Sequence, residues 1–324
     1  MSQFIKYQWR VLFILGLQSL FLLLLASTNT DQKVYIRNLV FSDFVADSRA
    51  AAQDRVNALI ADGFKTDTSA AAYLPYLNPR FQQELTRLQK DQQLKGRALA
   101  LAIAARLGDP KNSQICGVES LGRVVFDTDS GQGCCSDFSK AWLFYANHLG
   151  LPAREVNNLG HTTVEYWDAA LRKWVWLDPF MRMEMTDAEG LPLNQFEIRR
   201  MSLAETVRFV RLPGAQAGFE PRAYAGYHPS QYAAISWRRG VNFLEVEAWD
   251  TRLRALGLPK SLRQLALLTT GVQPRWLVLT TNALAFYLTL LQGLFLSVVG
   301  FFVALDGWLL FRLALWVRGR RRVG

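Results

Sequence analysis

The stretch from Gly131 to Pro179 reads GQGCCSDFSKAWLFYANHLGLPAREVNNLGHTTVEYWDAALRKWVWLDP, and it decides the fold. It contains one helix pattern followed by two strand patterns. The apolar residues of the helix pattern recur at helical spacing and lie on one face: Phe138, Ala141, Trp142, Tyr145 and Leu149. Gly150 and then Pro152 end the pattern. An amphipathic helix with Cys135 at its start is therefore predicted.

The start of this helix is a favourable place for a reactive thiol. Gly131 and Gly133 supply the turn that enters the helix, and Cys135 falls in or next to the first turn. The unpaired N–H groups and the dipole at a helix start favour an anion. We therefore expect the pKa of Cys135 to lie below the usual value of about 8.5.

Two strands are predicted after the helix, over 161–167 and 172–177, with 168–171 as a hairpin loop. Pairing Trp167 with Arg172 gives the register Glu165–Trp174, Thr163–Trp176 and His161–Asp178. Directly opposed residues share a sheet face, with Cβ atoms about 4.5–5.5 Å apart. A slip of one residue would separate the imidazole from the carboxylate. Asp178 would then orient His161, whose other ring nitrogen takes the proton of Cys135.

Four segments of this stretch resemble the transglutaminase-like superfamily: 133–139, 149–154, 161–165 and 174–179. The resemblance implies an α+β, papain-like fold in which the nucleophile helix packs on an antiparallel sheet. It also implies acyl transfer through a thioester, with Cys135 as nucleophile, His161 as base and Asp178 as orienting acid. Members of the superfamily include proteases, amidases, cross-linking transferases and inactive scaffolds, so the resemblance does not select a reaction. Thr162 departs from the alanine and aromatic that often follow the histidine, and the short gap before His161 predicts an open groove.

Further residues are candidates for supporting roles. The backbone N–H of Cys135 and the side chain of Gln132 are the candidate oxyanion donors. Asp137 is expected to support the helix start. Trp174 and Trp176 either wall a substrate groove or pack against the helix that carries Phe138 and Trp142.

The chain has three cysteines, Cys116, Cys134 and Cys135. Outside the cytoplasm a disulfide is permitted, and we expect a Cys116–Cys134 pair that leaves Cys135 reduced. The alternative is that all three are unpaired. Adjacent cysteines lack the ligand spacing of a zinc site, so neither a metal nor another cofactor is expected.

Two apolar regions predict attachment to a membrane, one at each end of the chain. Residues 11–26 form a leucine-rich run, either an uncleaved anchor, which we favour, or a cleaved signal peptide. Residues 276–317 are too long for one simple span. The alternatives are a span over about 284–305 followed by an interfacial helix over 308–316, two spans, or one extended helix.

The distribution of charge sets the expected orientation. The formal net charge is +10, and basic residues flank both apolar regions: Lys6, Arg10, Arg318, Arg320, Arg321 and Arg322. By the positive-inside rule both termini lie in the cytoplasm and the main domain is periplasmic, or otherwise extracytoplasmic, at the inner (cytoplasmic) membrane. The lipid bilayer is therefore an expected partner. Nucleic acid is not, because the arginines adjoin apolar segments and no nucleic-acid-binding motif is present.

The chain is expected to divide into an N-terminal membrane anchor (1–27), a helical lead-in (28–110), a transglutaminase-like catalytic domain with a C-terminal extension (111–275) and a membrane segment with a basic tail (276–324). Outside the central stretch the patterns predict helices over 46–60, 78–107 (with Gly96 as a weak point), 202–210 and 253–268 (broken at 257–259), a strand over 242–249 and a loop over 213–229.

Two functions from different classes fit these features. The first is a membrane-anchored cysteine hydrolase or acyltransferase acting on a peptide or carboxamide, with hydrolysis favoured because it needs no second binding site. The second is a non-catalytic module of the same fold that binds a partner in an envelope or surface-polymer assembly.

Overall fold

The computed structural model describes residues 11, 14–21, 27, 36, 39–40, 42–46, 83, 87, 94–107, 128, 130–158, 161–200, 208–211, 233–236, 243–270, 272, 276–280 and 282–320. The chain divides into two compact units. One comprises 1–42 with 286–324, and the other comprises 43–285.

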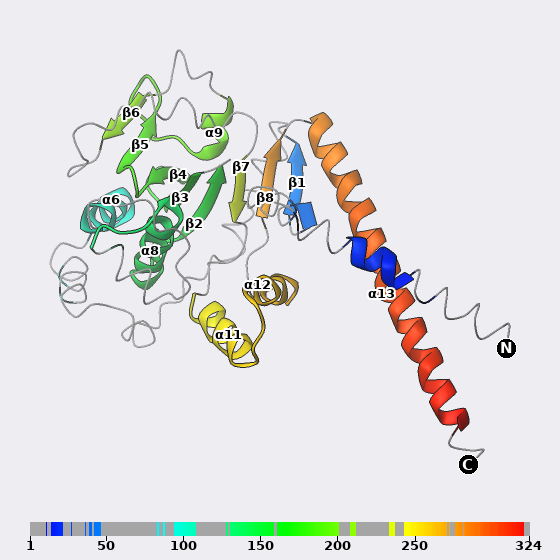
Figure 1. Ribbon diagram of the computed structural model, residues 1–324. Coiled ribbons are helices and arrows are strands. Elements are labelled where there is room, and N and C mark those ends of the chain that lie inside the picture. The colour runs from blue at the N-terminus through cyan, green and yellow to red at the C-terminus, as the bar shows by residue number, and fades with distance from the viewer. Residues whose placement is uncertain are drawn as a thin grey trace. The chain divides into compact units, whose positions relative to one another are not determined.

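Within the described residues, one sheet of eight strands runs in the order β1-β8-β7-β2-β3-β4-β5-β6 (Figure 1). The strands are β1 (Ser42–Ala46), β2 (Ala153–Asn158), β3 (His161–Asp168), β4 (Lys173–Asp178), β5 (Met183–Thr186), β6 (Arg208–Arg211), β7 (Ala233–Ser236) and β8 (Trp276–Thr280). From β8 to β6 each neighbouring pair is antiparallel. The helices are α6 (Gly96–Arg106), α8 (Cys135–His148), α9 (Gln195–Arg200), α11 (Phe243–Ala255), α12 (Lys260–Thr269) and α13 (Asn282–Arg320). The mixture of helices and an antiparallel sheet agrees with the predicted α+β class.

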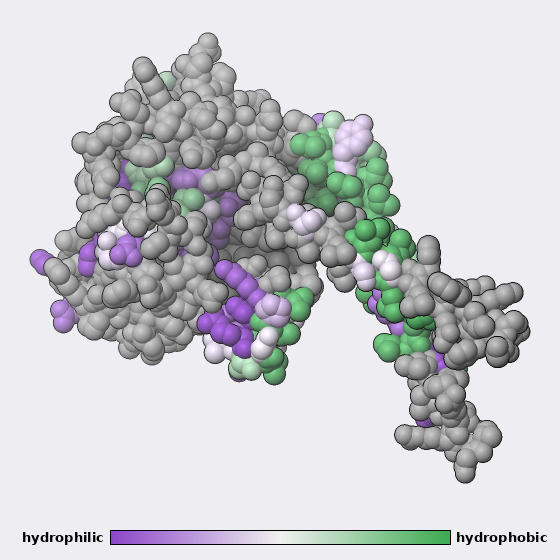
Figure 2. Space-filling view, viewed as in Figure 1, coloured by the Kyte–Doolittle hydropathy of each residue, from purple (hydrophilic) through white to green (hydrophobic). Residues whose placement is uncertain are grey.

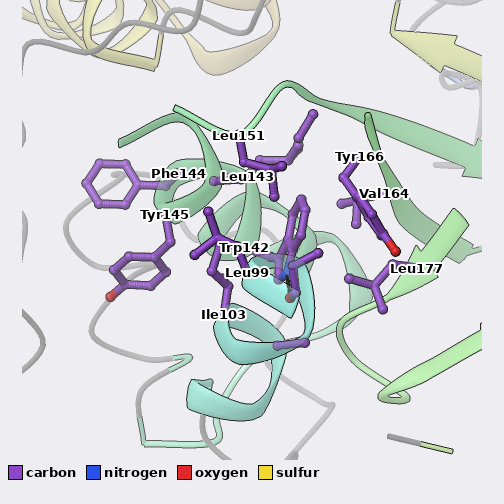
Figure 3. Close-up of a cluster of buried hydrophobic side chains, with 14 of the residues drawn as sticks. Leu99, Ile103, Trp142, Leu143, Phe144, Tyr145, Leu151, Val164, Tyr166 and Leu177 are labelled. Carbon is purple, nitrogen blue, oxygen red and sulfur yellow. Dashed lines mark hydrogen bonds between the residues drawn. The ribbon is translucent and has the colours of Figure 1, made fainter. Parts of the chain in front are cut away.

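The main core lies where α6 and α8 pack on one face of the sheet (Figure 3). Trp142 of α8 is fully buried there, and its Nε1–H donates to the carbonyl oxygen of Ala100 in α6 at 3.2 Å. Val164 and Tyr166 of β3 and Leu177 of β4 complete this core. The predicted amphipathic helix therefore buries its apolar stripe against the predicted hairpin.

A second cluster contains Trp176 together with Met183, Met185, Leu193 and Ile198. Side chains alternate between the two faces of a strand. Trp176 therefore faces away from α8, because its neighbours Val175 and Leu177 point into the main core. This second cluster is the layer through which β4, β5 and α9 pack together.

The hairpin between β3 and β4 is shifted from its predicted register. Trp167 pairs with Trp174 and Asp168 pairs with Lys173, so the loop is 169–172. The turn explains the shift. Asp168 Oδ1 accepts the N–H groups of Ala170 and Leu171 at 2.8 and 3.0 Å, and Arg172 closes the turn in the left-handed region with φ 53°.

Several predicted elements differ from the structure. The predicted strand over 242–249 is wrong, because α11 is helical from Phe243 to Ala255. The end of the predicted helix over 202–210 is wrong as well, since Arg208–Arg211 is strand β6. The predicted helix over 78–107 is interrupted, and α6 begins only at Gly96, which has φ 52°. The helical pair broken at 257–259 is confirmed as α11 and α12. The predicted helix over 46–60 and the loop over 213–229 lie outside the described residues, apart from Ala46 in β1.

The C-terminal apolar region is a strand followed by one helix. Residues Trp276–Thr280 form β8 and pair with β7, so the apolar region of 276–317 opens with a strand and not with a helix. From Asn282 to Arg320 the chain is a single helix of 39 residues, which agrees with the third alternative, one extended helix, and shows no interruption between 305 and 308. Among the described residues, one helix is long and apolar enough to cross a membrane, over Asn282–Arg312. Figure 2 shows hydrophobic residues gathered along the described surface of α13.

Residues 14–21 are helical and contact α13 within the same unit. The ring of Phe21 lies between Phe295 and Phe302, with centroid distances of 6.1 and 5.7 Å. Gln18 Nε2 donates to Asp306 Oδ1 at 2.8 Å. Because residue numbers rise along one helix as they fall along the other, the two segments run antiparallel.

Candidate active site

The start of α8 is built from three neighbouring residues. The backbone N–H of Cys134 donates to Asp137 Oδ2 at 3.2 Å, and the N–H of Asp137 donates to the carbonyl oxygen of Cys134 at 3.0 Å. Gly133 has φ 118°, and a Cβ there would lie 3.0 Å from the Cβ of Asp137. Asp137 is fully buried. Asp137 therefore caps the start of α8. The absence of a side chain at Gly133 leaves space for the Asp137 carboxylate.

Cys135 is the first residue of α8, is half-buried and carries a free thiol. Burial raises the pKa of the thiol, but the hydrogen bond and positive charge of His161 and the backbone N–H of Thr162 outweigh burial, so the pKa is lowered. A lowered pKa means that the thiolate, the nucleophilic form, persists at lower pH.

His161 opens β3 and is 5% exposed. Its Nε2 lies 2.6 Å from Asp178 Oδ2. Burial lowers the pKa of His161, but the charge and hydrogen bond of Asp178 and the contact with Cys135 outweigh it, so the pKa rises to about 10. Since Nε2 faces the carboxylate, Nδ1 is the ring nitrogen available to the sulfur. Each of the two groups therefore stabilises the charged form of the other, the thiolate and the imidazolium.

Asp178 ends β4 and is fully buried. Its Oδ1 accepts the N–H groups of Phe180 and Met181, both at 2.9 Å, which leaves Oδ2 for His161. The observed register places Asp178 two positions from direct opposition to His161, on the same sheet face. The diagonal neighbour remains within reach of these side chains. The structure therefore brings the sulfur, the imidazole and the carboxylate together.

The remaining candidates lie as follows. Gln132 is exposed just before α8. Trp174 and Trp176 are each 1% exposed. Trp174 packs edge-on against Trp167 at 5.7 Å, and Trp176 belongs to the second cluster. Both tryptophans point to the face of the sheet opposite α8, so neither packs with the α8 core. Their neighbours on that face bury them, so neither is open to solvent.

Cys134 is disulfide-bonded, whereas Cys135 keeps its thiol. Cys116, the cysteine expected to pair with Cys134, lies outside the described residues, so the Cys116–Cys134 pairing stays a prediction. Among the residues that the structure describes, no group of three or more His, Cys, Asp and Glu side chains is placed to hold a metal ion.

Sequence reasoning missed two features next to the site. Glu165 and Arg154 form a buried ion pair, with Arg154 Nε donating to Glu165 Oε2 at 2.7 Å, and the guanidinium stacks 4.2 Å from the ring centre of Trp174. Ser139 Oγ–H donates to the carbonyl oxygen of Thr162 at 3.0 Å. The second feature could have been predicted from the sequence, because Ser139 lies one helical turn after Cys135 and therefore on the same face of the helix.

No match to a curated protein was found. Among solved structures, the chain is similar to one described as "Role of Beta-hairpin motifs in the DNA duplex opening by the Rad4/XPC nucleotide excision repair complex", with 12% identity, TM-score 0.27, and coverage of 70% of this chain and 58% of that chain. It is also similar to one described as "Crystal structure of Rad4-Rad23 bound to a 6-4 photoproduct UV lesion", with 10% identity, TM-score 0.25, and coverage of 74% and 51%. The chain thus spans between half and three fifths of those chains. Likenesses at these scores carry no argument about fold or function.

The sequence also matches a family, over residues 79–180. That range contains α6, α8 and strands β2 to β4, and therefore Cys135, His161 and Asp178. Residues 79–180 are a domain of the transglutaminase-like superfamily.

Proposed function

We propose that this chain is a membrane-attached cysteine enzyme that cleaves or transfers acyl groups at a peptide or carboxamide bond. The observation that carries the proposal is the alignment of three groups: His161 lies 2.6 Å from Asp178 through Nε2 and faces the thiol of Cys135 with its other nitrogen. This is the nucleophile, base and orienting acid arrangement of acyl-transfer enzymes.

The reaction begins with the thiolate. Cys135 Sγ attacks the substrate carbonyl carbon, and the carbonyl oxygen becomes an oxyanion. The backbone N–H of Cys135 and the side chain of Gln132 are the candidate donors that would stabilise it. The His161 imidazolium then gives its Nδ1 proton to the leaving amine, the C–N bond breaks, and a thioester forms at Cys135. Neutral His161 next takes a proton from water, or from an acceptor amine, as that nucleophile attacks the thioester. The acid or the new amide leaves, and the thiolate–imidazolium pair is restored.

The helix α13 and the charges around it support a place for the reaction outside the cytoplasm. Asn282–Arg312 is apolar enough to span a bilayer, and the basic tail after it favours the cytoplasmic side. Lys6 and Arg10 favour the same side for the other terminus. The catalytic domain then works outside the cytoplasm, at the inner membrane, where a disulfide at Cys134 persists. Peptides and proteins of the cell envelope are the substrate class within reach of such a domain.

The experiment is labelling of the membrane-embedded full chain with an iodoacetamide probe between pH 5 and pH 10, followed by mass mapping. The wild type is expected to label at Cys135 with a midpoint well below 8.5, and Cys135→Ala is expected to lose both the label and turnover. Cys134→Ala is the comparison variant: it keeps the Cys135 thiol but breaks the disulfide at Cys134 and frees its partner thiol, so the label is scored by the peptide that carries it. Label that survives in Cys135→Ala and disappears in Cys134→Ala overturns the assignment of the nucleophile.

A second measurement separates the enzyme from a binding module. Incubation with an envelope peptide fraction, followed by acid quenching, is expected to trap an added acyl mass on the peptide that contains Cys135. A Cys135 midpoint near 8.5 together with full cellular function in Cys135→Ala indicates a non-catalytic module instead.

A further inference from the structure

The end of β3 that carries His161 has fewer strand contacts than the rest of the strand. The pairing of β3 with β4 begins at Val164 and Leu177, so residues 161–163 have β2 as their strand neighbour. A strand end held on one side moves more easily than one held on both. The position of His161 therefore depends on whatever else holds this end.

The helix α8 supplies that second attachment through Ser139. The Ser139 hydroxyl donates to the carbonyl oxygen of Thr162 at 3.0 Å, and both residues are buried, at 0% and 6% exposure. Ser139 lies one helical turn after Cys135, on the same face of α8. One rigid helix thus carries both the nucleophile and the anchor for the residue next to His161.

Thr162 is held at its other polar groups as well. Its Oγ1 donates to Asn157 Oδ1 on β2 at 2.9 Å. Its backbone N–H faces the Cys135 sulfur. The Thr162 residue therefore links α8, β2 and the nucleophile, and the Ser139 hydrogen bond is the one that ties it to the helix body.

We propose that Ser139 is a positioning residue that sets the distance between the His161 ring and the Cys135 sulfur by anchoring the Thr162 carbonyl. The inference rests on the proposed function, since it assigns a role within the same site. Ser139 acts through its hydrogen bond to Thr162 and is not itself one of the reacting groups. If Ser139 only satisfies a buried carbonyl, its loss lowers stability and leaves the thiol chemistry unchanged.

The test is the pH dependence of Cys135 alkylation in full-length Ser139→Ala. The alkylation midpoint is expected to rise by about one pH unit, which slows alkylation about tenfold below the midpoint, and kcat is expected to fall while KM stays near the wild-type value. Thr163→Val is the matched control. Thr163 lies next to Thr162 on β3 and is fully buried, and its Oγ1 has no hydrogen-bond partner within the described residues. Its alkylation profile is expected to equal that of the wild type.

The outcomes distinguish a failure of the proposed function from a failure of the positioning role of Ser139. A wild-type midpoint near 8.5, together with full cellular function in Cys135→Ala, defeats the proposed function itself. A lowered wild-type midpoint that is unchanged in folded Ser139→Ala defeats the positioning role alone. If Ser139→Ala does not fold, Ser139→Gly removes the same hydroxyl with more room for relaxation and is judged by the same midpoint.

A separate observation concerns the membrane unit. Asp306 is the one acidic residue of α13, and its carboxylate accepts the Gln18 amide at 2.8 Å. A carboxyl group within an apolar span is costly unless it finds a partner, and an amide on a neighbouring helix is one. The ring of Phe21 packs on the same side of α13, against Phe295 and Phe302.

We infer that the segment containing residues 14–21 is not cleaved from the mature protein. It forms a second membrane helix that pairs antiparallel with α13 through the Gln18–Asp306 hydrogen bond. The test is oxidative cross-linking of Phe21→Cys with Phe302→Cys in membranes, in a Cys135→Ala background with a tag before residue 1. The cross-link and the tag are both expected in the mature protein, and Asp306→Leu is expected to reduce the cross-link severalfold whereas Asp306→Asn preserves it. Loss of the tag from the mature chain, or a cross-link that is indifferent to Asp306→Leu, overturns the pairing.

Discussion

Asp178 holds His161 from a diagonal position on the neighbouring strand. Its Oδ2 lies 2.6 Å from Nε2, although the strand register, continued from Val164–Leu177, sets Asp178 opposite Thr163. Two backbone N–H groups fix the other carboxylate oxygen, so the charge that raises the pKa of His161 is held in one orientation.

Replacing Asp178 by asparagine is expected to narrow the active pH range from its alkaline side. The side chain keeps its shape but loses its charge, so the pKa of His161 falls from about 10 toward 6.5. The imidazolium then loses its proton at lower pH. The alkaline limb of the profile of kcat against pH is expected to move down, with a loss of about 10⁴-fold in kcat. Asp187→Asn is the control, because its Oδ1 caps an exposed turn through Leu191 N–H. An alkaline limb that stays in place contradicts the role of Asp178.

Gly133→Ala is expected to disturb the start of α8 by more than backbone strain alone. The residue has φ 118°, and the new Cβ would lie 3.0 Å from Asp137 Cβ, so the capping carboxylate must move. Gly190→Ala isolates the effect of backbone conformation, because Gly190 has φ 84° and nothing within 4 Å of the added Cβ. We expect Gly190→Ala to cost about 1–2 kcal/mol of unfolding free energy. Gly133→Ala is expected to cost more and to raise the alkylation midpoint of Cys135, measured by urea unfolding and by probe labelling. Equal losses without a change in the midpoint would contradict this account.

Glu165→Gln is expected to destabilise the domain strongly. Glu165 is fully buried, and Arg154, at 2% exposure, would keep its charge without a carboxylate partner. Breaking a buried pair in this way costs about 3–5 kcal/mol. Lys173→Gln is the comparison, because the Lys173–Glu197 pair is partly exposed, at 25% and 34%, and is worth under about 1 kcal/mol. The midpoint of urea unfolding in detergent measures both variants, and similar losses for the two would refute the distinction.

The central part of the fold could be predicted because its signals are local. The apolar spacing after Cys135 and the β-branched and aromatic runs around the hairpin belong to single elements. The register could not be predicted, since it depends on Asp168 accepting turn N–H groups and on the left-handed φ of Arg172. The error was two residues, which preserves the sheet face, and for that reason the expected meeting of His161 and Asp178 survived it.

Elements that depend on tertiary contacts could not be predicted from pattern alone. The segment 242–249 alternates as a strand does, yet it belongs to α11, where Asp250 binds Arg254 of the next turn and Arg263 of α12, both at 2.9 Å. The apolar run of β8 is too short to be distinguished from the start of a membrane helix by periodicity. The packing of Trp176 depends on Met183 and Met185 of β5 and on Ile198 of α9, which lie outside the stretch that suggested the site.

The contrast between Cys134 and its neighbour bears on how the protein must be produced. Cys134 is disulfide-bonded and forms the N-cap of α8, while Cys135, the proposed nucleophile, carries a free thiol. Expression in the cytosol would yield the chain without that disulfide, because thiols are kept reduced there. Export during synthesis, followed by purification without strong reductants, is therefore the route to material in which the disulfide at Cys134 is kept beside the free thiol of Cys135.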